Sequence, residues 1–201
     1  FYVVKALAHS IEQSKNVTPQ GTFIFAEDKQ VEVTTTTASE YTVFAGVTDS
    51  TLTIGYRGVS CNANWTACDY FRIIQYNGDT EDAAKLLWVK DELSLLQVEV
   101  EELLISDMSA ALRTGLEASI AAIANLSTYA DADALWQTMK KQIADAKTSI
   151  EGYEKLMAKI EDIFANVLID AEMNGYAELE AVVNAVMDKY TAGSIENAGV
   201  E

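Results

Sequence analysis

The sequence is poor in residues that interrupt or cross-link a chain. Among its 201 residues are one proline, one histidine and two cysteines. Because proline is so rare and no low-complexity tract occurs, we expect no long disordered linker. No apolar run reaches the roughly 18 residues that a membrane-spanning helix needs, so we predict no membrane insertion within this chain.

Positive charge is also scarce. The chain has 14 Lys and Arg residues against 31 Asp and Glu, and its net charge is −17. Residues 80–201 hold nine of the basic and 23 of the acidic residues. Since such a surface repels phosphate backbones and anionic lipid, we exclude nucleic acid and membrane headgroups as partners. Solubility is the simplest explanation of the charge, and recruitment of a basic protein partner is the alternative.

With a single histidine, the sequence offers few of the residues that common catalytic sites require. His9 is expected on a strand with no motif around it, whereas Ser-His-Asp and Cys-His sites need a histidine with fixed partners. The expected helices lack histidine, which excludes a di-iron bundle site. Asp131 and Asp133 resemble the start of a calcium loop, but the central Gly and terminal Glu are missing, so we favour helix capping. We therefore predict that the chain is not an enzyme.

The first part of the chain, residues 1–78, is typical of a β-rich domain. Short β-branched and aromatic runs recur at a spacing of about ten residues, with turn residues between them. We predict a jelly-roll-like antiparallel β-sandwich over residues 1–78, with strands at residues 2–4, 22–25, 31–34, 41–44, 52–56 and 70–74. Six strands are few for a closed sandwich, so either an upstream segment supplies more strands or the helices complete the sheet. Because the sequence begins with Phe1, not Met, directly at the first expected strand, we infer that the natural chain extends upstream, where any signal peptide would lie.

The second part, residues 79–201, is typical of an all-α up-down helical bundle. Thr80 followed by Glu81 and Asp82 indicates a helix N-terminus, because acids are favoured in a first helical turn. Apolar residues then follow heptad spacing through Leu86, Val89, Leu93, Leu96, Val100 and Leu103. The fold class is therefore predicted as α+β in tandem, a β-sandwich followed by a helical bundle.

Further helix ends can be placed in the bundle. We expect helix starts at Ser106-Asp107 and at Asp131 or Asp133, and stops at Asn174-Gly175 and Ala192-Gly193. The inward-facing stripe of the third helix should continue through Met157, Ile160, Phe164 and Val167. Gly152 costs only about 1 kcal/mol within a helix, so one long helix and two shorter ones both remain open.

The only cysteines, Cys61 and Cys68, are separated by six residues. If the flanking strands pair, the two ends of this loop face each other at the separation of about 5.5 Å that a disulfide requires. We favour a disulfide, which would imply an oxidising compartment, and two unpaired buried thiols are the alternative. Zinc is unfavoured, because no second Cys or His pair completes four ligands.

The stretch from Leu52 to Gly78 reads LTIGYRGVSCNANWTACDYFRIIQYNG. It resembles the last hairpin of the galactose-binding-like jelly roll found in secreted and surface glycan-utilisation proteins of Bacteroides-type bacteria. The residues that match are Leu52-Thr53-Ile54-Gly55, Asn64-Trp65, Asp69-Tyr70-Phe71-Arg72-Ile73 and Tyr76-Asn77-Gly78. The resemblance implies a carbohydrate-associated role and a secreted or outer-surface location. A helical bundle often follows such a jelly roll.

Four residues of this stretch are candidate site residues. Trp65, with Tyr56 and Arg57, could bind a sugar, because the apolar face of a sugar ring stacks on aromatic rings. Trp65 could equally fix its loop onto the domain, and we favour that role. Asp69 could ligate a structural calcium ion or accept backbone N–H bonds, and we favour the hydrogen bonds. No other cofactor is expected.

Three functions follow, from different classes. The leading one is a non-catalytic secreted or cell-surface module that binds or presents carbohydrate. The second is a structural or protein-interaction module in which the acidic bundle acts as a spacer or docking surface. The third is an accessory region of a larger glycan-degrading enzyme. A glycan and a protein partner at the bundle are accordingly the two candidate partners.

Overall fold

A computed structural model describes residues 2–9, 20–24, 30–33, 39–45, 55–60 and 67–195 of the chain. Side-chain burial is described for Phe44 and for residues 72–195. Contacts divide the chain into two compact units, Phe1–Trp88 and Val89–Glu201. The division falls inside the first helix, α1 (Glu81–Leu103), ten residues after the expected end of the β-rich part.

The strands of the first unit form two three-stranded antiparallel sheets. In one sheet β1 (Tyr2–His9) lies between β4 (Ser39–Ala45) and β6 (Ala67–Gln75). In the other, β2 (Gln20–Ile24) lies between β3 (Gln30–Val33) and β5 (Gly55–Ser60). Consecutive strands β5 and β6 therefore belong to different sheets and do not form a hairpin.

A small apolar core joins the first sheet to the beginning of α1. Tyr76 and Ala84 are buried at its centre, and Phe44, Ile74 and Trp88 pack against them. The rings of Phe44 and Trp88 are 6.2 Å apart between centroids. Since Phe44 belongs to β4 and Ile74 to β6, the described apolar contacts of this sheet are made with a helix.

This packing shows that the predicted β-sandwich is wrong. A jelly roll has eight strands in two sheets, whereas the strands here are divided between two three-stranded sheets, and the described core residues meet α1. The region described with its side chains, residues 72–195, holds the end of one strand followed by four helices. Over residues 72–195 the fold class is that of a helical bundle, and the strands that the structure describes do not form the predicted jelly roll.

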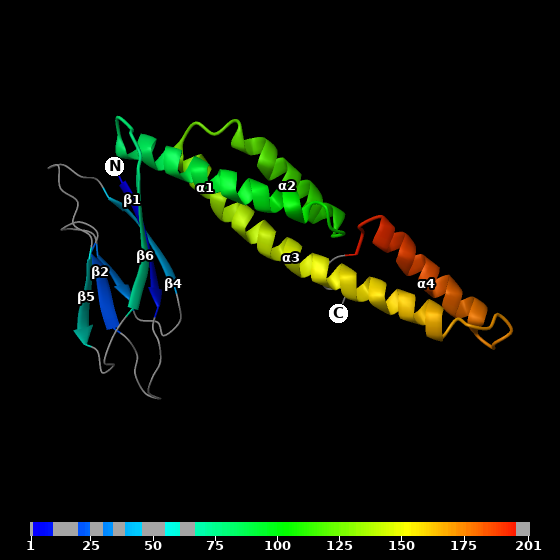
Figure 1. Ribbon diagram of the computed structural model, residues 1–201. Helices are drawn as coiled ribbons and strands as arrows, with labels where there is room; N and C mark the ends of the chain where they lie inside the picture. The colour runs from blue at the N-terminus through cyan, green and yellow to red at the C-terminus, as the bar shows by residue number, and fades with distance from the viewer. Residues whose placement is uncertain are drawn as a thin grey trace. The chain divides into compact units, whose positions relative to one another are not determined.

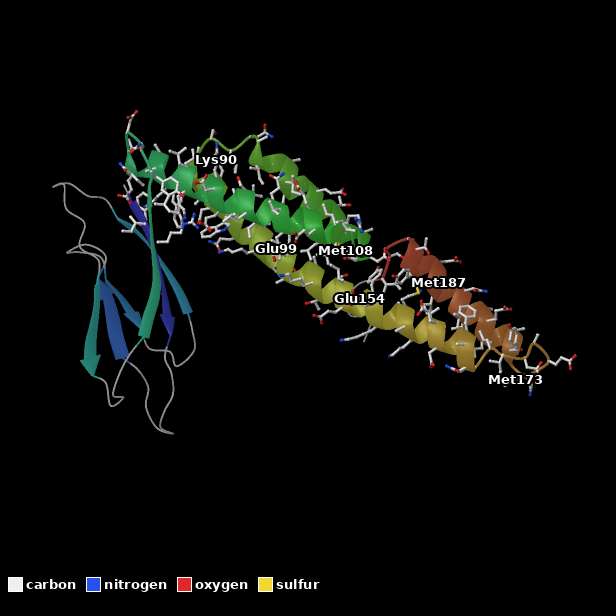
Figure 2. The ribbon with its side chains drawn as sticks, in the orientation of Figure 1. Lys90, Glu99, Met108, Glu154, Met173 and Met187 are labelled. Carbon is white, nitrogen blue, oxygen red and sulfur yellow. The ribbon has the colours of Figure 1, made fainter. Side chains whose placement is uncertain are left out.

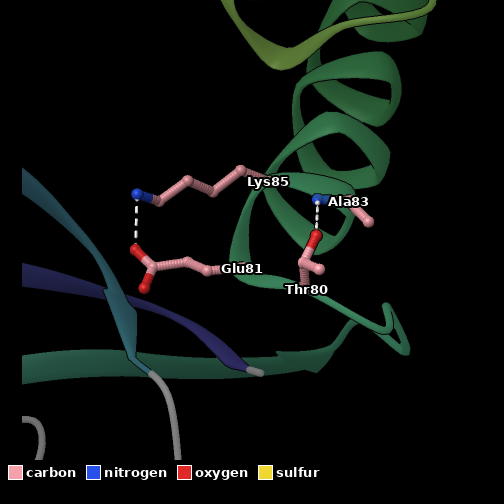
Figure 3. A network of polar contacts seen from close by, with 4 residues as sticks. All are labelled: Thr80, Glu81, Ala83 and Lys85. Atoms are coloured by element: carbon pink, nitrogen blue, oxygen red, sulfur yellow. Dashed lines mark hydrogen bonds and ion pairs between the residues drawn. The ribbon is translucent and has the colours of Figure 1, made fainter.

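Helix α1 begins where the sequence places it. The Thr80 hydroxyl oxygen accepts the backbone N–H of Ala83 at 3.2 Å, and Lys85 pairs with Glu81 one turn further on (Figure 3). The predicted N-cap at Thr80 is thus confirmed. Because the ion pair is partly exposed to solvent, the cap contributes more to the helix end than the pair does.

We expect Thr80→Ala to destabilise the protein by about 1 kcal/mol, since the N–H of Ala83 would lose its partner. Urea unfolding monitored by circular dichroism measures the change. Thr148→Ala is the matched control, because Thr148 lies exposed inside a helix and alanine has the higher helix propensity. An equal loss in both variants would contradict a capping role for Thr80.

The second unit is built around one long helix, α3 (Tyr129–Asn166), which has 38 residues and a length of about 57 Å. The helix continues without interruption through Gly152, so of the two alternatives left open by the sequence, one long helix is correct and two shorter ones are not. Figure 1 shows α2 (Ala110–Ile123) alongside the first half of α3 and α4 (Tyr176–Thr191) alongside the second half.

The first half of α3 packs with α1 and α2. The side chains of Leu93, Leu116 and Met139, one from each helix, are fully buried. Ser119 of α2 donates to the amide oxygen of Gln142 at 2.8 Å, and Lys147 pairs with Glu99 of α1 at 2.7 Å. The Lys147 pair is exposed and so contributes little. Burial of the apolar stripes therefore holds these helices together.

The second half of α3 forms a hairpin with α4. Ile160, Leu168 and Val183 are buried between them, and partly buried apolar side chains surround this cluster: Leu156, Ile163, Tyr176, Leu179, Val186 and Met187. The connecting turn, residues 167–175, ends at Gly175, whose φ of 84° suits glycine. Helix α3 thus ends at Asn166, eight residues before the stop expected at Asn174.

The two halves meet at a helix junction formed by Ser109, Ser149, Tyr153, Gly193 and Ile195. The N–H of Ser109 donates to the Ser149 hydroxyl at 3.1 Å. The Tyr153 hydroxyl donates to the carbonyl of Ile195 at 3.0 Å and accepts its N–H at 3.3 Å. Both bonding side chains come from the middle of α3, so this part of the helix binds the start of α2 and the segment after α4.

Backbone groups at the ends of α1 and α2 also find partners beside the junction. The N–H of Ala110 donates to the carbonyl of Gly193 at 2.8 Å, and the N–H of Leu112 donates to the Ser109 hydroxyl. Arg113 donates to the carbonyls of Leu104 and Ser106 at 2.6 and 2.7 Å. Helix α2 is therefore capped by Ser109, and the expected start at Ser106-Asp107 lies two or three residues too early.

Candidate functional site

The residues singled out as ligand candidates are not gathered into a site. Tyr56 and Arg57 lie in β5, opposite Phe23 and Thr22 of β2. Asp69 lies in β6, opposite Leu7 of β1, in the other sheet. Trp65 lies outside the described residues. Sugar binding by Trp65, Tyr56 and Arg57 and calcium binding by Asp69 thus receive no support from the described backbone, and they stay predictions.

The cysteines are a similar case. Cys68 lies in β6 opposite Ala8, whereas Cys61 follows β5 and lies outside the described residues. The expected disulfide rested on pairing of the two flanking strands, but β5 pairs with β2 and β6 with β1. The disulfide stays a prediction, without the strand pairing that motivated it.

Within the described ranges, no three His, Cys, Asp or Glu side chains are grouped closely enough to hold a metal ion. Asp131, one of the two aspartates considered for calcium, lies in the first turn of α3 behind the N-cap Thr128. The Thr128 hydroxyl donates to its carboxylate at 2.6 Å and accepts its N–H at 3.2 Å. The expected helix start at Asp131 or Asp133 is therefore two or more residues late.

None of the helices in the described part of the chain has the length and apolar character needed to cross a membrane.

The surface that stands out is the end of the α3–α4 hairpin. Ten large hydrophobic side chains are exposed in the described region, and four of them lie within residues 164–173. We call these four the apolar tip: Phe164, Val167, Ile169 and Met173, which are 41, 43, 69 and 48 % exposed. Single exposed hydrophobic residues are ordinary on protein surfaces, whereas several within one short turn make that turn a candidate interaction site. Figure 2 shows Met173 at the turn, at the opposite end of the hairpin from the junction.

The backbone of this turn is held in place by hydrogen bonds. The N–H groups of Val167 and Leu168 both donate to the carbonyl of Ile163, at 3.0 and 2.8 Å. Further along, the N–H of Met173 donates to the backbone carbonyl of Asp170, and the N–H of Tyr176 donates to the carbonyl of Met173, both at 3.1 Å. Leu168 is buried between its exposed neighbours. The apolar tip is therefore displayed by an ordered turn.

The charge around the apolar tip has one sign. Residues 160–188 include seven Asp and Glu residues and no Lys or Arg. The nearest basic residues along the chain are Lys159 and Lys189, on either side of this segment. A surface that combines exposed apolar side chains with uncompensated negative charge suits a partner that is both apolar and basic.

Sequence reasoning missed this surface. The heptad phase placed Phe164 and Val167 in the core, continuing the stripe that includes Ile160. Both are exposed, because α3 ends two residues after Phe164 and α4 begins only at Tyr176. The absence of Lys and Arg from residues 160–188 was the available sequence signal, since it sets this segment apart from the preceding helix.

Tyr190 lies near the junction and has a perturbed pKa. Burial, and then the hydrogen bond that its hydroxyl donates to Asp107 at 2.8 Å, raise the pKa of Tyr190 to about 12. The folded state thus holds the phenol proton more tightly than the unfolded chain, in which the pKa is about 10. This stabilisation is complete below pH 10 and is lost as the pH rises towards 12.

We therefore expect the stability difference between the protein and its Tyr190→Phe variant to shrink between pH 10 and pH 12. Urea unfolding of both proteins at pH 8 and near pH 11.5 measures it. All other ionisable groups are common to both proteins, so their contributions cancel in the difference. A constant difference across the range would show that the Asp107 contact does not control the titration of Tyr190.

No family model, curated protein or solved structure matches this chain. The resemblance to a galactose-binding-like jelly roll is therefore wrong: no known member supports it, and the strands that should form its last hairpin lie in different sheets. Carbohydrate binding loses the support of that resemblance, and sugar binding by Trp65, Tyr56 and Arg57 stays a prediction. A secreted or outer-surface location stays a prediction that no described residue tests.

Proposed function

We propose that the helical unit is a non-catalytic spacer that presents a protein-binding surface at one end. The observation that carries this proposal is the continuous α3, which serves both the α1–α2 half and the α4 hairpin. An up-down bundle would bring four helices together along their lengths, whereas here α2 and α4 occupy successive parts of α3. This arrangement makes the helical unit longer than a bundle of the same four helices packed around one shared core.

The hydrogen bonds at the junction indicate that α3 is rigid where its two halves meet. Its hydrogen bonds involve Ser149 and Tyr153, whose side chains are almost fully buried. Because buried polar groups are costly to leave unpaired, a bend in α3 at this point would have to break bonds that cannot be replaced by water without opening the core. The two halves should therefore move as one body.

A distance measurement between spin labels tests the spacer. We place labels at Ala130→Cys and Lys159→Cys, two exposed positions of α3 on either side of the junction, in a background that also carries Cys61→Ser and Cys68→Ser. The positions are 29 residues apart on one face of the helix, so we expect a narrow distribution centred at about 44 Å between the labelled backbone positions.

A second label pair gives the width that the labels themselves contribute. Ala130→Cys and Thr148→Cys both lie before Ser149, on the same side of the junction, about 27 Å apart. If the 130–159 distribution is no wider than the 130–148 distribution, α3 is rigid through the junction. A broad or two-peaked 130–159 distribution beside a narrow 130–148 one would overturn the spacer.

A further inference from the structure

The apolar tip also indicates what the spacer presents its surface to. Val167 and Ile169 point outward from a turn whose intervening residue, Leu168, is buried in the hairpin core. The turn cannot rotate to bury both exposed neighbours without withdrawing Leu168. Their exposure is thus fixed by the fold and would be relieved only by another molecule.

We propose that the apolar tip, Phe164, Val167, Ile169 and Met173, docks a basic amphipathic helix of a partner protein. This inference rests on the proposed function, because the apolar tip is the surface that lies at the end of the proposed spacer. The apolar face of the partner would cover the four side chains, and its Lys and Arg residues would face the acidic residues of segment 160–188.

Charge selects this partner over two other occupants. A second copy of the tip would bring two surfaces of the same negative sign together, because residues 160–188 hold seven acidic and no basic residues. An anionic membrane would be repelled for the same reason. Of these three occupants, only a basic amphipathic helix would be stabilised both by apolar contact with the tip and by attraction to its acidic residues.

The probe is a synthetic amphipathic helix of about 18 residues made of Leu and Lys, labelled with a fluorophore and titrated with the full chain. We expect saturable binding that weakens as salt rises, since the charge contribution is screened. Val167→Ser and Ile169→Ser should each weaken binding about tenfold, the effect of losing much of one buried apolar side chain. A peptide with Glu in place of Lys should not bind.

Leu95→Ser is the matched control. Leu95 is 62 % exposed on α1, among acidic residues such as Glu92 and Glu99, and lies outside the hairpin. Unchanged binding by this variant, with weaker binding by the two tip variants, supports docking at the tip. Equal losses in all three would mean general attraction of a cationic peptide to an acidic protein, and would overturn the proposal.

Two further outcomes would also overturn it. Binding of the chain to phosphatidylcholine vesicles, lost in Ile169→Ser, would assign the tip to a membrane surface. A concentration-dependent dimer in light scattering, abolished by the same substitution, would assign it to a second copy. Absence of peptide binding together with a narrow 130–159 distance distribution removes the docking proposal and leaves the spacer, so the two proposals fail separately.

Discussion

Replacing Gly193 by alanine should destabilise the protein by about 2–4 kcal/mol. Its φ of 62° is left-handed, which costs a residue with a Cβ about 1–2 kcal/mol. The added Cβ would also stand 2.9 Å from the backbone nitrogen of Ala110, closer than such atoms approach one another. Relief of this contact would move Gly193 away and lengthen its 2.8 Å hydrogen bond with Ala110.

Gly175→Ala separates the two causes. Gly175 also has a left-handed φ, of 84°, but nothing lies within 4 Å of the position that a Cβ would take. This variant should lose only about 1 kcal/mol, from backbone strain alone. Urea unfolding of both variants, followed by circular dichroism, gives the comparison. Equal losses would show that the contact between Gly193 and the start of α2 contributes nothing to stability.

Tyr153→Phe should cost about 1–3 kcal/mol. The substitution keeps the ring, which is buried and lies 5.0 Å from that of Tyr190 between centroids. It removes the hydroxyl that bonds both the carbonyl and the N–H of Ile195. Because Ile195 is itself buried, these backbone groups would lose their partner in a place that water does not reach. Urea unfolding again measures the loss.

Tyr176→Phe is the control for this substitution. Tyr176 packs at the edge of the hairpin core and is only partly buried, so its hydroxyl can be solvated. The same chemical change there should alter stability by less than about 0.5 kcal/mol. If Tyr153→Phe reduced stability by equally little, the hydrogen bonds between Tyr153 and the segment after α4 would not stabilise the junction.

Local signals in the sequence were enough to predict much of the helical part. The cap at Thr80 was predictable because a hydroxyl before two acids satisfies free N–H groups at a helix start. The buried positions of α1 followed from heptad spacing, and Val89, Leu93 and Val100 are indeed fully buried. Each of these signals depends on neighbours within one or two helical turns.

What could not be predicted depends on contacts between distant residues. Ser109 caps α2 although Ser106 and Asp107 are equally good capping residues, because only Ser109 also meets Ser149 of α3. Strand pairing was misjudged for the same reason: adjacency in sequence favoured a β5–β6 hairpin, whereas β6 pairs with β1, which is 58 or more residues earlier. The apolar tip is exposed because α4 starts too late to cover it.

Amide hydrogen exchange across residues 146–156, followed by mass spectrometry of peptides, shows whether α3 passes through the junction as one rigid helix. We expect these amides to exchange as slowly as those of residues 136–145, because both segments are hydrogen-bonded in the same helix and packed on both sides of Ser149. Exchange around Gly152 that is orders of magnitude faster than in residues 136–145 would show a hinge, and would contradict the spacer.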